Sequence, residues 1–175
     1  FLSHLDAIEA LAADLEAIGS DPPPAPRWDQ DWFPRLDAAA AYAMVRRHRP
    51  RRIVEIGSGH STRFLARAVA DGKLETSIVS IDPQPRATIE GLPVQTLRTL
   101  VQEAGTAPFA GCDLLFIDSS HQLRPGSDVE FLLGKILPDL PRGVLVHFHD
   151  IFLPDGYPAD WAWRRYNEQA AVEKL

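Results

Sequence analysis

Residues 51–72 read RRIVEIGSGHSTRFLARAVADG, and this stretch decides the fold. It opens with a short apolar strand pattern, passes through a turn that contains Gly57 and Gly59, and continues with apolar residues at helical spacing up to Gly72. A strand that runs through a tight turn into a helix is typical of a parallel sheet covered by helices. We therefore expect the rest of the chain to be built around this unit.

The alternation of strand and helix continues toward the C-terminus. Further strands are expected at SIVSID (77–82), PVQTLRT (93–99), DLLFID (113–118) and VLVHFHD (144–150). A helix is expected between the last two, at residues 126–137, GSDVEFLLGKIL. Parallel strands need crossover connections, and helices supply them on both sides of the sheet. The sequence thus predicts an α/β fold with a doubly wound, mostly parallel sheet and helices on both faces.

The N-terminal part differs in composition from the rest. Residues 1–18 place apolar side chains at helical spacing, Ser3 and Asp6 suggest a capping box at the start, and the prolines at 22–24 end the pattern. A second helix is expected at 36–48. We predict two regions, an N-terminal helix with a Pro/Trp-rich linker at 1–35 and one domain at 36–175. The linker tryptophans, Trp28 and Trp32, either pack on that domain or line a pocket.

Composition excludes several classes of protein. The chain has 175 residues, 45% of them apolar and 24% charged, which is typical of a soluble globular domain. A net charge of −6 has the wrong sign for a nucleic-acid binder, and no apolar run approaches the roughly 20 residues that span a bilayer. The one cysteine, Cys112, can form neither an internal disulfide nor a zinc-binding cysteine cluster. We expect a cytoplasmic protein without nucleic-acid or membrane partners.

Polar groups collect where the predicted strands end. The first strand runs into the glycine turn, and three later strands end at Asp82, Asp118 and Asp150. Ligands of open parallel sheets bind beyond the carboxyl ends of the strands. The stretch VLVHFHD has the composition of a strand buried on both faces, yet it ends in His147, His149 and Asp150. A site at this edge explains that ending.

The glycine turn narrows the choice of ligand. Its second glycine is followed by Thr62 where a dinucleotide fingerprint has a third glycine, and no GK[ST] phosphate loop is present. Asp82, at the end of the next strand, can accept hydrogen bonds from both hydroxyls of a ribose. Glu55 lies inside the first strand and needs a hydrogen-bonding or cationic partner there. The alternative is that the turn merely connects strand and helix.

Several motifs in order resemble one known family. VEIGSGHSTRFLARA, SIDPQP, DLLFIDSSH, GVLVHFHDIFLP and YNEQ are similar to class I S-adenosylmethionine-dependent methyltransferases, and in particular to the methyltransferase-24 family. The resemblance covers about residues 51–169 and implies a Rossmann-like fold. It further implies that the glycine turn, with Glu55, Gly57, Ser58 and Gly59, holds the amino-acid part of S-adenosylmethionine and that Asp82 binds its ribose. Asp118 is also implied to bind the cofactor.

The same resemblance leaves the catalytic chemistry open. The family's D-x-x-H and H-D motifs correspond to Asp118 with His121 and to His149 with Asp150. One reading is a divalent metal, Mg²⁺ or Mn²⁺, on Asp118, His149 and Asp150. A second is metal-free catalysis in which His121 or His149 is the base and Asp118 assists. A third is a structural pair of His121 with Asp118. His147, deeper in the strand, is expected to be a core histidine.

The implied activity is O-methylation of a small hydroxylated molecule of the sugar or natural-product type. Two alternatives stand: a cofactor-binding module of a larger protein without efficient catalysis, and another nucleotide-dependent enzyme such as a dehydrogenase. We expect a small-molecule acceptor as partner and keep a homodimer open. Only residues 151–175 follow the last strand, so the final strand pair of the fold is expected to be missing. Tyr157, Trp161 and Trp163 form an aromatic wall or anchor a helical tail at about 160–174.

Overall fold

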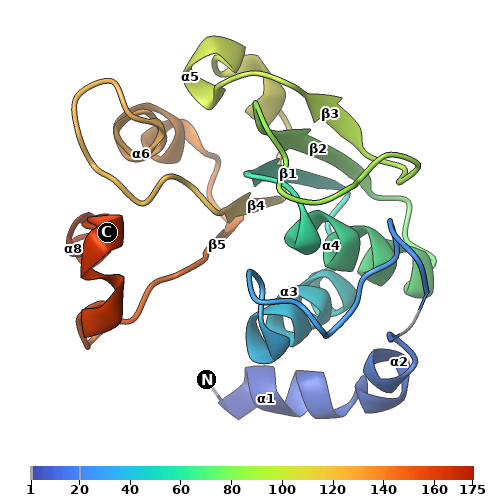
Figure 1. Ribbon diagram of the computed structural model, residues 1–175. Helices are drawn as coiled ribbons and strands as arrows, with labels where there is room; N and C mark the ends of the chain where they lie inside the picture. The colour runs from blue at the N-terminus through green and yellow to red at the C-terminus, as the bar shows by residue number, and fades with distance from the viewer. Residues whose placement is uncertain (1, 20) are drawn as a thin grey trace.

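The computed structural model describes residues 2–19 and 21–175, and its centre is one parallel sheet (Figure 1). The strand order is β3-β2-β1-β4-β5, and every pairing is parallel, so the predicted doubly wound sheet is confirmed. The strands are β1 (Arg52–Ile56), β2 (Ser77–Ile81), β3 (Gln95–Leu97), β4 (Leu114–Ile117) and β5 (Leu145–Phe148).

The sheet forms because β-branched side chains alternate across it. In β1, Ile53 packs into the core on one face and Val54 into the core on the other, and both are fully buried. β1 is the central strand, paired with β2 on one side and with β4 on the other. The order of strands switches at β1, so the carboxyl ends of β1 and β4 form the edge where such folds bind ligands.

Helices cover both faces, as predicted (Figure 1). One face carries α1 (Leu2–Glu9), α2 (Ala12–Glu16), α3 (Arg35–His48) and α4 (His60–Asp71). The other carries α5 (Val101–Ala104), η1 (Ala107–Phe109), α6 (Asp128–Phe131), η2 (Leu132–Ile136) and α7 (Leu137–Asp139). The last three are consecutive turns of the helix expected at 126–137, and Ser127 caps its start by accepting a hydrogen bond from the Glu130 amide.

The N-terminal segment packs on the domain but is not one helix. Residues 2–16 form α1 and α2, separated near Ala10 and Leu11, and Ser3 lies inside α1 rather than capping it. The capping box was therefore a wrong prediction. Leu15 and Ile18 are buried in the same core as α3 and α4. The division of the chain at residues 35 and 36 stays a prediction.

The strand β5 differs from its prediction. The apolar sequence predicted burial on both faces, but β5 pairs only with β4 and its residues are half-buried. After β5, the described residues form no further strand, and the tail consists of η3 (Ala159–Arg164) and α8 (Gln169–Val172) instead of one long helix. Among the described helices, none combines the length and apolarity that a bilayer-spanning helix needs.

Candidate active site

The glycine turn between β1 and α4 is shaped by the protein's own backbone. Gly57 has φ +79°, and a Cβ atom placed on it would collide with the carbonyl oxygen of Asp118 at the end of β4. The Gly57 amide donates to the carbonyl of Ile81, 3.1 Å away in β2. Gly57 is thus required where three neighbouring strands end together.

Glu55 supports this turn from inside the protein. Its side chain is fully buried, and its two carboxylate oxygens accept hydrogen bonds from the hydroxyls of Ser61 at 2.8 Å and Thr62 at 2.7 Å. The Thr62 hydroxyl also accepts from the Gly59 amide at 2.9 Å. Burial raises the pKa of Glu55 to about 7, although the two hydroxyls oppose that shift. The predicted hydrogen-bonding partner of Glu55 is therefore provided by the first turn of α4.

Asp82 holds the opposite side of the turn. One carboxylate oxygen accepts from the amide of Ser58 at 2.6 Å and from its hydroxyl at 3.1 Å, and the other accepts from the Gln84 amide at 2.7 Å. The carboxylate is thereby fixed at the end of β2, next to the glycine turn. Three of the carboxylate's four acceptor sites are thereby used, and one remains on Oδ1 for a ligand.

A cavity of about 630 Å³ opens at this edge of the sheet. Its walls come from the glycine turn, the end of β2, the start of α5 and the loop after β4; the predicted site residues among them are Gly57, Ser58, Asp82 and Asp118. Glu55, which is fully buried, and Gly59 of the turn do not line it. The volume lies in the range of about 300–1,000 Å³ that is usual for ligand sites.

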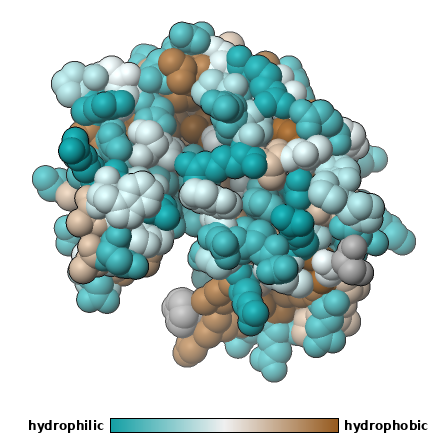
Figure 2. Space-filling view, viewed as in Figure 1, coloured by the Kyte–Doolittle hydropathy of each residue, from teal (hydrophilic) through white to brown (hydrophobic). Residues whose placement is uncertain are grey.

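A second cavity of about 230 Å³ adjoins the first. The two share Arg86 and Asp118, so Asp118 lies at their junction. The second cavity has aromatic walls from Trp32, Phe152, Trp161 and Tyr166 and carboxylates from Asp31, Asp37, Asp118 and Asp150. Figure 2 shows the surface hollowed between the C-terminal tail and the side of the molecule formed by α1 and α3.

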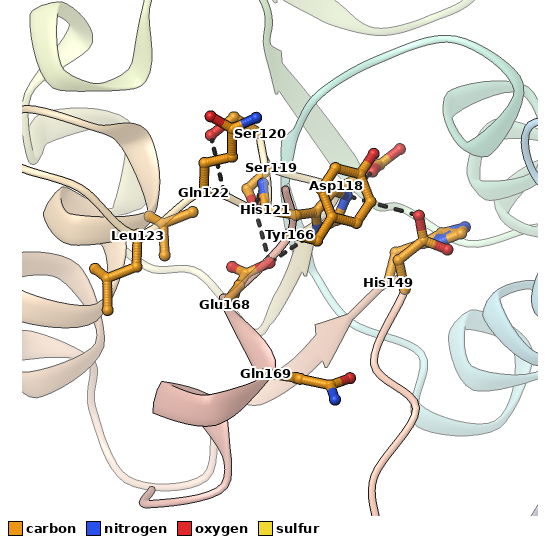
Figure 3. Close-up of polar contacts among 12 residues, drawn as sticks. Asp118, Ser119, Ser120, His121, Gln122, Leu123, His149, Tyr166, Glu168 and Gln169 are labelled. Carbon is orange, nitrogen blue, oxygen red and sulfur yellow. Dashed lines mark hydrogen bonds and ion pairs between the residues drawn. The ribbon is translucent and has the colours of Figure 1, made fainter. Parts of the chain in front are cut away.

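Asp118 is one end of a buried chain of charged groups (Figure 3). His121 Nε2 lies 3.1 Å from Asp118 Oδ1, and His121 Nδ1 lies 2.8 Å from Glu168 Oε2. The His121 side chain is 3% exposed and that of Glu168 is 1% exposed. The Ser119 hydroxyl also donates to Glu168, at 2.9 Å. Glu168 belongs to the C-terminal tail, so this chain joins the tail to the end of β4.

The charge of His121 decides its role. Burial alone would lower its pKa, but the hydrogen bonds with Asp118 and Glu168 raise that pKa to about 9. For Asp118, burial acts to raise the pKa, and the hydrogen bond from His121 lowers it below its usual value. At neutral pH His121 is therefore protonated and both its nitrogens face carboxylates. A protonated imidazole has no lone pair to take a proton, which favours the structural reading of the pair and leaves Asp118 facing the cavities.

Comparison with known proteins agrees with this geometry. A family profile described as a methyltransferase domain, of the methyltransferase-24 type, matches residues 54–151, more than half of the chain. This chain belongs to that family. Its members are class I S-adenosylmethionine-dependent methyltransferases, as the motifs predicted. The matched range begins in β1 and ends just after β5, so it contains the glycine turn and the polar ends of all five strands.

The fold of this methyltransferase is also found in a solved structure. SAH-bound Podospora anserina methyltransferase PaMTH1 matches with a TM-score of 0.58 and 21% sequence identity, over 98% of this chain and 75% of that one. At this identity the likeness concerns the fold. A search of curated proteins gave no match.

The second histidine motif of the methyltransferase is arranged differently from the first. His149 is buried against Phe33, with ring centroids 5.1 Å apart, and lines neither cavity. Its Nδ1 lies 3.2 Å from Asp150 Oδ1, but the geometry is not that of a hydrogen bond. Asp150 lines the second cavity, and its Oδ2 lies 3.8 Å from His121 Nε2. Of the four residues in the two motifs, three thus share a cavity.

The positions of these side chains do not support the interpretation that the site binds a metal ion. Within residues 2–19 and 21–175, no three His, Cys, Asp or Glu side chains are placed to hold a metal ion. Asp118, His149 and Asp150 as metal ligands therefore stay a prediction. His147, expected in the core, is half-buried on the edge strand with its ring 4.7 Å from that of Phe116, and burial lowers its pKa to about 4.

Sequence reasoning missed several residues of the second cavity. Asp37 and Arg86 belong to no motif, and Arg164 lies in a tail that was predicted to be helical. Glu168 does not line the cavity but holds His121 from behind; it lies in YNEQ and was not predicted as a site residue. Burial raises the pKa of Asp37. Of the aromatic residues considered, Trp28 packs on Phe64, whereas Trp32 and Trp161 line the second cavity. Trp163 is 75% exposed, and Tyr157 packs against other tail aromatics.

Proposed function

We propose that this methyltransferase transfers the methyl group of S-adenosylmethionine to an oxygen of a small hydroxylated molecule. The observation that carries the proposal is the pair of adjoining cavities with Asp118 at their junction. The larger cavity adjoins the glycine turn, and the smaller has room for one ring-sized acceptor. Methyl transfer requires a donor and an acceptor site that meet at one point, and this arrangement supplies both.

The larger cavity fits the cofactor in shape and chemistry. The carboxylate of Asp82, fixed by Ser58 and Gln84, keeps an acceptor site on Oδ1 for a ribose hydroxyl. The turn at Gly57 and Ser58 exposes backbone to the cavity, where the amino-acid end of the cofactor would lie. PaMTH1, which has a similar fold, is bound to SAH. These features support S-adenosylmethionine as the cofactor, with Gly57, Ser58, Asp82 and Asp118 nearest to it.

When bound, the cofactor supplies a methyl group that is activated by the positive charge on its sulfur. The remaining task is to align the acceptor hydroxyl and to take its proton as the new oxygen–carbon bond forms and the sulfur–carbon bond breaks. Asp118 is ionised at neutral pH and faces both cavities, so it can accept that hydrogen bond and the proton. His121 and Glu168 hold the Asp118 carboxylate in place from behind.

Titration calorimetry with S-adenosylmethionine, SAH and NAD tests the cofactor, and a screen of hydroxylated acceptors against their deoxy analogues tests the transfer. We expect binding of the first two ligands, and methyl transfer only to the hydroxylated compounds. Asp118→Asn should lower transfer about 100-fold, the contribution of a general base, while SAH still binds. Binding without transfer to any acceptor would instead favour the module without efficient catalysis.

A chelator arm of the same assay addresses the metal. If Asp118, His149 and Asp150 bind a divalent ion during turnover, a chelator abolishes transfer and added Mg²⁺ or Mn²⁺ restores it. Transfer that survives the chelator at full rate would support base catalysis without metal.

A further inference from the structure

Arg164, at the end of η3, lies among the aromatic side chains of the second cavity. Its Cζ is 4.1 Å from the ring centroid of Trp161, 5.5 Å from that of Tyr166 and 6.0 Å from that of Trp32. The backbone is held at this place, because the carbonyl of Arg164 accepts a hydrogen bond from the Gln122 side chain at 3.0 Å. The guanidinium is thus fixed in a largely apolar wall of the cavity.

Arg164 forms no ion pair in the described part of the chain, although carboxylates line other parts of the cavity. No carboxylate in the described part of the chain lies within 4.0 Å of it. Its Nη1 donates to the Tyr166 hydroxyl at 3.2 Å, while its Nε is buried without a hydrogen-bond partner. A cation that has lost part of its hydration and has no counter-ion favours an anion brought next to it.

A second arginine faces the same ring of Trp32. Arg86 lies with its Cζ 4.3 Å from the Trp32 ring centroid, and it too has no carboxylate within ion-pair distance among the residues described. Arg86 and Arg164 both line the second cavity. Two unpaired guanidinium groups, arranged about one tryptophan, give this part of the wall a positive charge.

One carboxylate of the cavity, Asp31, precedes Trp32 in the linker, and the others lie in different elements. Asp37 is in the first turn of α3, while Asp118 and Asp150 follow β4 and β5. They suit the hydroxyl end of an acceptor, since a carboxylate accepts hydrogen bonds from hydroxyl groups. The cavity therefore offers two chemistries: hydrogen-bond acceptors from α3 and from the ends of β4 and β5, where Asp118 meets the first cavity, and cationic donors from Arg86 and Arg164 beside the aromatic rings.

We propose that the acceptor carries an anionic group, a carboxylate or a phosphate, and that Arg164 binds it with the help of Arg86. This inference rests on the proposed function, because it assigns the second cavity to the acceptor. The guanidinium group binds both anions through paired N–H donors, and the aromatic rings strengthen the contact by excluding water. The reacting hydroxyl then points toward Asp118, and the cavity of about 230 Å³ limits the acceptor to about one ring.

Binding of simple ring compounds to the SAH-saturated protein tests the inference without knowledge of the natural acceptor. The probes are benzoate, phenyl phosphate, neutral benzamide and cationic benzylamine, each measured by calorimetry. We expect benzoate or phenyl phosphate to bind about tenfold or more tightly than benzamide, as a charge-assisted contact provides. The better of the two anions identifies the group as carboxylate or phosphate.

Substitutions of Arg164 test whether its side chain causes the preference for anionic probes. Arg164→Gln should remove the preference for the anion, and Arg164→Lys should retain part of it, since lysine keeps the charge but loses the paired donors. Arg165→Gln is the matched control: it removes one positive charge from the neighbouring, exposed position. SAH binding by each variant shows that the fold is intact. If the unmutated protein did not bind SAH, the proposed function itself would be refuted, independently of Arg164.

Three outcomes would overturn the inference. The first is that benzamide or benzylamine binds as tightly as both anions. The second is that no anion binds to a protein that does bind SAH. The third is that Arg164→Gln and Arg165→Gln change the anion preference equally, because a general loss of positive charge would then explain it.

Discussion

The two ends of the candidate active site are built in different ways. At the glycine turn, Glu55, Ser61 and Thr62 are linked within eight consecutive positions, and Asp82 joins them from the next strand. In the second cavity, His121 meets Glu168 across 47 residues, and Trp32 of the linker meets Arg164 of the tail. The end that we propose for the cofactor thus depends on local contacts, and the end that we propose for the acceptor depends on contacts between distant segments.

This difference indicates which substitutions each end of the site tolerates. A local turn is fixed when its strand and helix form, so it is sensitive to backbone geometry and little affected by the tail. An assembled cavity requires that the tail is docked, so it is sensitive to the buried groups that hold the tail in place. Variants in the two regions should therefore separate cofactor binding from methyl transfer.

The largest effect is expected at Gly57. Gly57→Ala places a methyl group against the Asp118 carbonyl at a positive φ, so we expect loss of about 3 kcal/mol or more of unfolding free energy and no measurable SAH binding. Gly105→Ala is the matched control, because Gly105 has φ +69° and open space around its Cβ position. With φ +69° and ψ −156°, it should cost about 1–3 kcal/mol from backbone strain alone, without the collision. Equal effects of the two would show that the collision is unimportant.

Glu168→Gln should break the assembled end while sparing the local one. It removes one charge from a buried pair, so the free energy of unfolding should fall by about 3 kcal/mol, measured by urea denaturation. Methyl transfer should fall with it, while SAH affinity changes by less than about threefold. Glu173→Gln, at an exposed position, is the control. If SAH affinity fell as much as transfer, the two ends would not be independent.

A pH dependence is expected from Glu55. Its pKa is raised to about 7 in the folded protein, so the stability linked to its protonated form is fully present below its ordinary pKa near 4.5. That stability is lost as the pH rises through about 7, on the order of 3 kcal/mol in total. The side chain in Glu55→Gln cannot ionise, so the unfolding free energy of this variant should not show this fall with pH. Glu75→Gln, at an exposed position, should show the same fall as the unmutated protein. Unfolding free energies measured across this pH range would decide; parallel curves for all three proteins would contradict the prediction.

The smallest effect is expected at Asp82, which tests the cofactor end through a ligand contact. Asp82→Ala should weaken S-adenosylmethionine binding by about 1.5–3 kcal/mol, or roughly 10- to 100-fold, because a charge-assisted hydrogen bond is lost. Transfer at saturating cofactor should change little. Asp155→Ala, at an exposed site, serves as control. Unchanged affinity in a folded variant would remove Asp82 from the cofactor site.

The same difference explains what could be predicted from the sequence. The unit at 51–72 was predicted correctly because strand period, glycine turn and helix period lie in one stretch, and Asp82 follows at the next strand end. Glu55 could be assigned a partner because a buried carboxylate always needs one. These inferences rely on neighbours in sequence or on rules that hold for every parallel sheet.

The acceptor end could not be predicted in this way. No local signal connects Glu168 with His121 or Trp32 with Arg164, because their meeting depends on how linker and tail cross the sheet. The burial of β5 was misjudged for a related reason: an apolar strand sequence indicates β structure but not whether a strand pairs on one side or both. The charge of His121 could likewise not be predicted from the sequence, because it depends on the carboxylates of both Asp118 and Glu168 lying beside the imidazole.

The position of Trp32 between two arginines has a consequence for how this protein can diversify. Trp32 belongs to the linker and Arg164 ends the short helix η3 of the tail, and neither contributes to the strand ladder. Substitutions there can alter which molecules enter without disturbing the sheet, because loops tolerate change better than the elements they join. Gene duplicates can therefore inherit the same methyl-donating half and evolve different acceptors through these two segments alone.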